Sequence, residues 1–246
     1  MTDVLVIDTS TNAVAVACGS SKTDSSSRCV SQQSFHSENI LVAIDEVLKE
    51  RSIEPSQISA VGVGIGPGLF TGLRVGITAA HSFAHALGIP LVYFSSLELT
   101  ALSSLEPQQS SKQHIIVARD ARRHELYFAK YSLSRIAASE FKVDTTIFST
   151  CLDRVFEECL VSPKEFVDRA NEDQDCFVVL DDKSKYEEFL DFDEKHRENL
   201  IEAKIDASSM VDHVVDSVMA GIVTSPFAPS ALYIRKSDAE LSWGTK

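Results

Sequence analysis

Apolar residues open the chain in three short runs separated by polar turns. The runs lie at residues 4–8, 13–18 and 29–35, and the polar stretch 20–27 separates the last two. Runs of this length, bounded by polar clusters, are typical of β-strands. The pattern therefore predicts a three-stranded meander whose second turn is a long hairpin loop.

The spacing of apolar residues then changes to a helical period. Leu41, Ile44 and Leu48 lie three or four residues apart, with Glu46 and Lys49 on the opposite face, which predicts an amphipathic helix over about 36–50. Strand, helix, strand and helix are predicted next, in that order, at residues 58–65, 71–87, 91–94 and 95–105. Strands joined by crossover helices indicate an α/β sheet that is covered by helices.

A second set of elements follows the polar stretch 107–112. Strands are predicted at 115–117, 125–131 and 177–180, a helix at about 208–222, and an extended segment at 232–235. We predict an α/β fold of two βββαβα halves, with mixed sheets, flanking helices and a cleft between them. The halves are placed at 1–106 and 107–246, with the last helix able to pack back on the first half.

Composition and charge limit the kinds of partner that this chain can bind. Of the 246 residues, 44% are hydrophobic, and the net charge is −13. Residues 151–206 hold 18 acidic and 8 basic residues, a net −10, which suits either a solvated surface or a docking surface for a basic partner. Binding nucleic acid alone requires Lys and Arg to neutralise phosphates, so we do not expect this chain to bind RNA by itself.

Cysteine usage and hydropathy indicate the compartment. The number of cysteines is odd and no two are two residues apart, which argues against a disulfide framework and a zinc ribbon. The first residues lack the basic region of a signal peptide. No apolar run approaches the roughly 20 residues of a membrane span. We expect a cytoplasmic protein without membrane contact.

Glycine is concentrated in one segment. Seven of the ten glycines lie between positions 62 and 88, and Gly66-Pro67-Gly68 joins a predicted strand to a predicted helix. Such a turn gathers backbone N–H groups that hold phosphates. It equally lets a helix pack close to a sheet, and both interpretations stay open. The segment is not a Walker loop, because no Lys-Ser/Thr pair follows.

Acidic and hydroxyl side chains close the first predicted strand at Asp8-Thr9-Ser10-Thr11. Actin-like ATPases begin their first phosphate loop with an acid and hydroxyls at such a turn, and an Asx-type hairpin turn has the same composition. A degenerate nucleotide site would consist of Asp8, Thr9, Ser10, Gly66, Gly68 and Thr71.

Six segments together resemble the TsaB/YeaZ family. They are Val6-Ile-Asp-Thr-Ser10, His36-Ser-Glu38, residues 64–74, residues 88–98, Asp120-Ala-Arg-Arg123 with Glu125-Leu-Tyr127, and Leu232-Tyr-Ile-Arg235. Their order and spacing match from end to end. Residues 64–98 are the most specific part, and residues 135–225 match only loosely.

The resemblance implies an actin-like ATPase (ASKHA) fold and a bacterial, non-catalytic subunit. Such a subunit is needed to make threonylcarbamoyladenosine next to the anticodon of tRNAs. It binds and activates the enzyme subunit TsaD, works with the ATPase TsaE, meets tRNA only through the complex, and forms a homodimer when alone. No firm cofactor is implied, although ATP or ADP at a subunit interface stays open. The partner interface is expected near Leu41, Ile44, Leu48, Arg74, Thr78 and His81.

The residues also argue against catalysis by this chain. TsaD carries two metal-ligand histidines where Ser96 and Thr100 stand here, and hydroxyls do not replace imidazoles at such a site. His81 and His85 are spaced for one helix face but precede the strand at 91–94, with no acid between them. We expect neither catalytic residues nor a metal.

The second phosphate loop is also altered. At residues 120–123, side chains stand where an actin-like ATPase needs glycines, so weak or absent ATP hydrolysis is expected. Arg122 and Arg123 could contact a phosphate or an acidic partner, or could belong to a solvated turn.

Three alternatives stay open. An actin-like ATPase, kinase or metalloprotease-type enzyme would need an intact second phosphate loop or three metal ligands. A tRNA-binding module would need a basic face. A stand-alone homodimeric scaffold has the same composition as a partner subunit, and titration with TsaD would separate the two.

Overall fold

The computed structural model describes residues 2–31, 38–105, 112–133, 152–186, 189, 191–198, 200–223, 232 and 234. The predicted helix start at His36 and Ser37, the polar boundary near residues 106–111 and most of the tail after residue 223 lie outside the described residues. None of the described helices is long and apolar enough to cross a membrane.

The first half contains one mixed five-stranded sheet in the order β3-β2-β1-β4-β5. Its elements are β1 (Val4–Asp8), β2 (Ala13–Gly19), β3 (Ser25–Ser31), α1 (Glu38–Arg51), β4 (Ala60–Gly64), α2 (Phe70–Leu87), β5 (Leu91–Phe94) and α3 (Ser96–Ser104). β1 pairs antiparallel with β2 and parallel with β4. All five residues of β1 are buried, because helices cover both faces of this central strand.

The second half repeats this plan in the order β10-β9-β6-β7-β8. Its elements are β6 (His114–Asp120), β7 (Leu126–Ser132), β8 (Asp153–Val161), α4 (Pro163–Asn171), β9 (Cys176–Leu180), α5 (Lys183–Tyr186), α6 (Glu194–Glu198), β10 (Leu200–Glu202), a 3₁₀ turn (Ala207–Met210) and α7 (Val211–Met219). Each sheet is an antiparallel meander extended by parallel crossover strands. The predicted α/β fold with two mixed sheets is confirmed.

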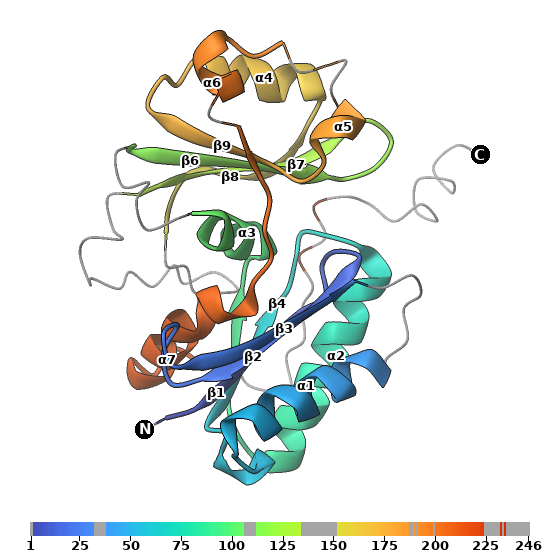
Figure 1. Cartoon of the computed structure of the whole chain (residues 1–246), viewed down its shortest axis with the longest axis vertical. Coiled ribbons are helices and arrows are strands. Elements are labelled where there is room, and N and C mark those ends of the chain that lie inside the picture. Colours follow the sequence, from blue (N-terminus) through green and yellow to red (C-terminus); the bar gives the residue numbers. More distant parts are fainter. Residues whose placement is uncertain are drawn as a thin grey trace.

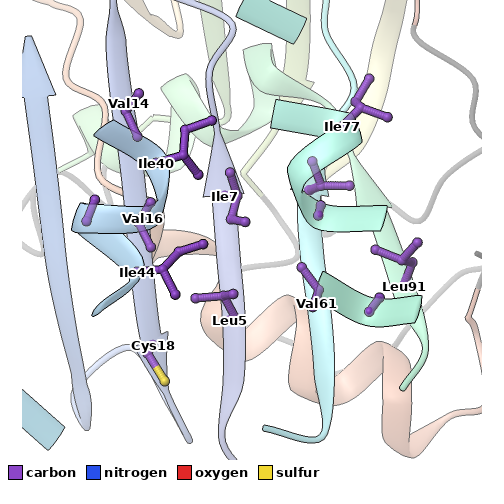
Figure 2. Close-up of a cluster of buried hydrophobic side chains, with 14 of the residues drawn as sticks. Leu5, Ile7, Val14, Val16, Cys18, Ile40, Ile44, Val61, Ile77 and Leu91 are labelled. Carbon is purple, nitrogen blue, oxygen red and sulfur yellow. The ribbon is translucent and has the colours of Figure 1, made fainter. Parts of the chain in front are cut away.

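Alternate residues of β1 face two different helical layers. Leu5 and Ile7 pack with α1 and α2, where Ile44 points at the sheet (Figure 2). On the other face, Val4 and Val6 pack with residues of α7 such as Val214. The C-terminal helix therefore lies on the sheet of the first half.

Helix α3 joins the two halves. It lies between the two sheets (Figure 1). Its Leu99 packs with the first sheet, whereas Leu97 and Ala101 pack with Ile115 and Val117 of β6. Because α3 and α7 each contact residues of the opposite half, the two halves are held together by buried packing rather than by a linker alone.

One prediction of local structure was wrong, and two elements were missed. The loop predicted at 20–27 is shorter, since β3 already begins at Ser25 and pairs with Gly19 of β2. Polar residues suit this edge strand because only one of its sides pairs with another strand. The sequence reasoning also missed β8 and α4 altogether. The start of α4 carried a readable signal, because Ser162 caps the helix, Pro163 follows at the first position, and Glu165 lies in the first turn.

Candidate functional site

The turn after β1 is buried and bonded within the protein. Asp8, Thr9 and Ser10 are at most 3% exposed. Oδ1 of Asp8 accepts hydrogen bonds from the Ser10 backbone N–H at 3.0 Å and from the Ser10 hydroxyl at 2.6 Å. The Thr9 hydroxyl donates to the carbonyl oxygen of Gly72 in α2 at 2.7 Å. The acid and hydroxyls at this turn therefore bind the protein's own atoms.

The glycine-rich segment packs directly against this turn. A Cβ atom on Gly64 would overlap the Asp8 carboxylate, one on Gly76 the Thr9 hydroxyl, and one on Gly68 the Ser10 backbone. The glycines thus allow the start of α2 to approach β1 closely, which is the packing interpretation of the sequence. The structure brings Gly68 next to Ser10 and joins Gly66 to Ser96 by hydrogen bonds, while Thr71 is exposed.

Two serines at the start of α3 connect this turn to the second half. The Ser96 hydroxyl donates to Oδ2 of Asp8 at 2.6 Å and accepts the backbone N–H of Gly66 at 3.2 Å. Ser95 caps α3 by accepting the N–H groups of Leu97 and Glu98. The Ser95 hydroxyl donates in turn to the carboxylate of Glu158 in β8.

Glu158 is the second acidic group of this network. Its Oε1 also accepts the Tyr131 hydroxyl at 2.9 Å, and Nε of Arg154 lies 3.9 Å away. Burial raises the pKa of the Glu158 carboxyl, and the nearby Arg154, Ser95 and Tyr131 only partly oppose this effect. Burial and the charge of Glu158 likewise raise the pKa of Tyr131.

The pKa of Glu158 leads to a testable pH dependence. A raised pKa means that the folded state binds the proton more tightly than the unfolded chain does. The free energy of unfolding should then fall as pH rises from about 4.3, the unfolded value, through the folded pKa. The Glu158→Gln variant lacks this titration. Between the unfolded and the folded pKa, its free energy of unfolding should therefore rise relative to that of the wild type, by about 1.4 kcal/mol for each pKa unit. Urea unfolding at several pH values measures this; a difference between the two proteins that does not change with pH would contradict it.

The second phosphate-loop position is occupied by a tightly held turn. Arg122, Arg123 and His124 all have positive φ, at 64°, 53° and 58°, a backbone region that is costly for residues other than glycine. Asp120 anchors the turn by accepting the Arg122 N–H at 2.7 Å and the Tyr186 hydroxyl at 2.5 Å. Burial alone would raise the pKa of Asp120, but Lys185 and Tyr186 hold it below its usual value. This turn therefore carries side chains at the positions where an actin-like ATPase needs glycines.

The expected partner residues divide into two sets. Leu41 is 62% exposed, and Arg74 and Thr78 of α2 are also exposed. Ile44 and Leu48 are only 4% and 5% exposed and belong to the core, so their side chains line no surface of this chain, and the expected interface near them stays a prediction. The helical stripe that predicted α1 is the face that packs on the sheet.

Other apolar side chains of α1 and α2 are also exposed. Val42 is 55% exposed and Phe70 38% exposed. The guanidinium of Arg74 lies 3.8 Å from the centroid of the Phe70 ring. The half-buried His81 bonds through Nε2 to the Tyr93 hydroxyl at 2.5 Å. We call Leu41, Val42, Phe70, Arg74 and Thr78 the α1–α2 face.

Histidine and hydroxyl positions discussed as metal sites have other roles. Thr100 donates its hydroxyl to the backbone oxygen of Ser96 at 2.8 Å, so the two positions compared with metal ligands are engaged within α3 and with Asp8. Within the part of the chain that the structure describes, no three His, Cys, Asp or Glu side chains are grouped so as to hold a metal.

Comparison with known proteins identifies the family. A family model described as "TsaD: tRNA N6-adenosine threonylcarbamoyltransferase" matches residues 30–243. The chain is 30% identical over 190 residues to the tRNA threonylcarbamoyladenosine biosynthesis protein TsaB of Haemophilus influenzae, which covers 76% of this chain and 75% of that protein. The chain belongs to the TsaB/YeaZ family.

Further relatives agree with this assignment. The TsaB protein of Escherichia coli is 30% identical over 128 residues, which covers 52% of this chain and 54% of that protein. The structure of YeaZ from Pseudomonas aeruginosa matches with a TM-score of 0.75 at 22% identity, over 95% of this chain and all of the other. The chain therefore shares the fold of YeaZ, as the resemblance implied.

Several residues of the junction were missed by the sequence reasoning. Ser95 was expected only as a helix cap, and Glu158 and Tyr131 were given no role. Arg119, whose guanidinium donates a hydrogen bond to Ser10, was also given no role. Phe70 lay inside the glycine-rich segment, where its exposure could not be read from the sequence. The one available signal was the Ser95-Ser96 pair. The sequence analysis compared Ser96 with a metal-ligand position and did not consider that its hydroxyl could donate a hydrogen bond to Asp8.

Proposed function

We propose that this chain is a non-catalytic subunit in the biosynthesis of threonylcarbamoyladenosine in tRNA. It binds the threonylcarbamoyltransferase subunit TsaD through the α1–α2 face and activates it. The names of the TsaB relatives and the TsaD-like family match support the pathway. The observation that carries the subunit role is the α1–α2 face itself.

The chemistry of this face suits a protein partner. It places the aliphatic side chains Leu41 and Val42 and the stacked pair Phe70 and Arg74 on two helices that pack on the same side of one sheet. Aromatic and arginine side chains are enriched at protein interfaces, so the Phe70–Arg74 pair is the expected anchor, and Leu41 and Val42 add exposed apolar area on α1.

The junction between the halves supports a non-catalytic role. The atoms that would face a nucleotide are bonded to one another: Asp8 to Ser10 and Ser96, and Thr9 to the start of α2. A phosphate would have to displace these buried bonds, at a cost of about 1–3 kcal/mol for each polar group left unpaired. ATP or ADP, if bound, is then expected at the surface shared with a partner rather than at the turn after β1.

The remaining partners follow from the same proposal. The net charge of −13 opposes direct binding to tRNA, so tRNA meets the chain only within the complex. We expect a homodimer through the same α1–α2 face when TsaD is absent, and the ATPase TsaE to join the assembled complex in the cytoplasm.

The test is light scattering after size-exclusion chromatography, on the chain alone and mixed with TsaD. We expect a homodimer that exchanges into a heterodimer. Leu41→Glu, which places a charge on the α1–α2 face, should weaken the heterodimer at least about tenfold, or 1.4 kcal/mol.

The matched control is Met219→Glu. Met219 ends α7, on the opposite side of the same sheet, and is 78% exposed. It introduces the same charge in place of an exposed apolar side chain and should leave pairing unchanged. Equal effects of the two variants would refute the α1–α2 face, and a homodimer that ignores TsaD would favour the stand-alone scaffold.

A further inference from the structure

One cation is buried at the junction between the halves. Arg119, at the end of β6, is only 4% exposed. Its Nη1 donates to the Ser10 hydroxyl at 2.9 Å and its Nη2 to the Ser10 carbonyl oxygen at 3.2 Å. An arginine from the second half thus holds a single residue of the first half, 109 positions earlier in the chain, with two parallel hydrogen bonds.

The charge of Arg119 is balanced indirectly. The Ser10 hydroxyl accepts from Arg119 and donates to Oδ1 of Asp8 at 2.6 Å. The hydroxyl therefore lies between the cation and the carboxylate and links them through two hydrogen bonds. Nε of Arg119 is buried without a hydrogen-bond partner among the described residues. A partly satisfied buried guanidinium adds little net stability to the whole protein. A contribution to global stability therefore does not explain why an arginine occupies this position.

The Ser10 carbonyl oxygen provides a mechanical connection to α2. It also accepts the backbone N–H of Leu69 at 2.8 Å. Leu69 directly precedes Phe70, the first residue of α2, and its own carbonyl oxygen accepts the N–H of Leu73. Arg119 and the first turn of α2 therefore share one acceptor atom.

We infer that Arg119 is a positioning residue that sets the N-terminal turn of α2, and with it Phe70 and Arg74, from the second half of the protein. Removing the guanidinium takes away two of the hydrogen bonds that hold Ser10, while the bonds of Ser10 to Asp8 and Leu69 remain. The first turn of α2 then samples more open arrangements, so the stacked Phe70–Arg74 pair is presented less uniformly. This mechanical coupling follows from the structure alone, whereas its consequence for partner binding rests on the proposed function.

Hydrogen exchange of the isolated chain tests the coupling without any partner. In Arg119→Met, amide exchange over residues 65–75 should rise about tenfold, reporting a loss of local stability near 1.4 kcal/mol. Arg119→Lys should give an intermediate rise, since an ammonium keeps the positive charge but lacks the rigid planar fork with which the guanidinium reaches both Ser10 oxygens. It also serves as the informative variant if Arg119→Met does not fold.

The control must lower stability without touching Ser10. Phe166→Leu removes ring packing from the core of the second half, where Phe166 contacts Phe128 and Phe192. At a matched melting temperature it should leave exchange over residues 65–75 near the wild-type rate. The inference is overturned if the Arg119 variants exchange there like the wild type or like Phe166→Leu.

Partner affinity then separates the inference from the proposed function. With TsaD, Arg119→Met should bind about tenfold more weakly than Phe166→Leu of equal stability. If even the wild-type chain does not bind TsaD, the proposed function fails, while the exchange data still decide whether Arg119 positions α2. Wild-type affinity in Arg119→Met, despite faster exchange, would overturn the functional part of the inference.

Discussion

Gly64→Ala should destabilise the protein by roughly 3 kcal/mol or more, although it adds only one methyl group. The Cβ would overlap the Asp8 carboxylate and come within 2.9 Å of the Ser96 hydroxyl oxygen. Overpacking a core costs about 1–3 kcal/mol, and disturbing the buried bonds of Asp8 adds about 1–3 kcal/mol more. Urea denaturation of the purified variant measures the loss.

Gly88→Ala is the control variant that separates the cost of overpacking from the cost of backbone strain. Gly88 ends α2 with φ of 67°, and a Cβ atom added there would meet no other atom within 4 Å. Its replacement should cost only about 1 kcal/mol, from the left-handed backbone. If Gly64→Ala proved as mild as Gly88→Ala, the turn after β1 would have room to move, and the claim that Gly64 packs tightly against Asp8 would fail.

The sequence predicted the first half well because its signals are local. β1, β4, α2 and β5 have uniform apolar character or clear helical spacing, and Gly88 ends α2 as its position suggested. β8 was missed because it is an edge strand of mixed polarity, with a register irregularity opposite β7 that removes simple alternation. Local patterns cannot identify such a strand, since its pairing with β7 is what stabilises it.

The candidate site was predictable only in part, for a related reason. Asp8, Ser10, Gly66 and Gly68 are close in the structure, as expected, but what they bind depends on residues far away in the sequence. Glu158 lies within an acidic stretch where any carboxylate looks solvated. The burial of this residue against Ser95 and Tyr131 becomes visible only when the two halves are packed together.

The same limit explains why Ile44 was placed at the interface. A helical stripe of apolar residues marks the buried face of a helix, and it does not show whether a sheet or a partner covers that face. Here Leu5, Ile7 and Val16 of the first sheet lie in one core cluster with Ile44 (Figure 2). The proposed partner surface of α1 is instead formed by Leu41 and Val42, which are the exposed apolar residues of this helix.

Ile44→Glu should therefore prevent folding rather than dissociate a complex. An unpaired carboxylate in this core costs several kcal/mol, and the lost burial of the isoleucine adds about 2 kcal/mol. Together these costs rival the total stability of about 5–15 kcal/mol that is typical of a domain. We expect a protein without a cooperative thermal transition by circular dichroism.

Leu41→Glu, three residues earlier on the same helix, is the matched variant. Because Leu41 is 62% exposed, the melting temperature of the Leu41→Glu variant should stay within about 2–4 °C of the wild type. The pairing of this variant with TsaD should nevertheless weaken. The two variants thus separate folding from binding on a single helix. A folded, monomeric Ile44→Glu protein would show that this face of α1 is accessible in solution, and the assignment of the α1–α2 face would then have to be reversed.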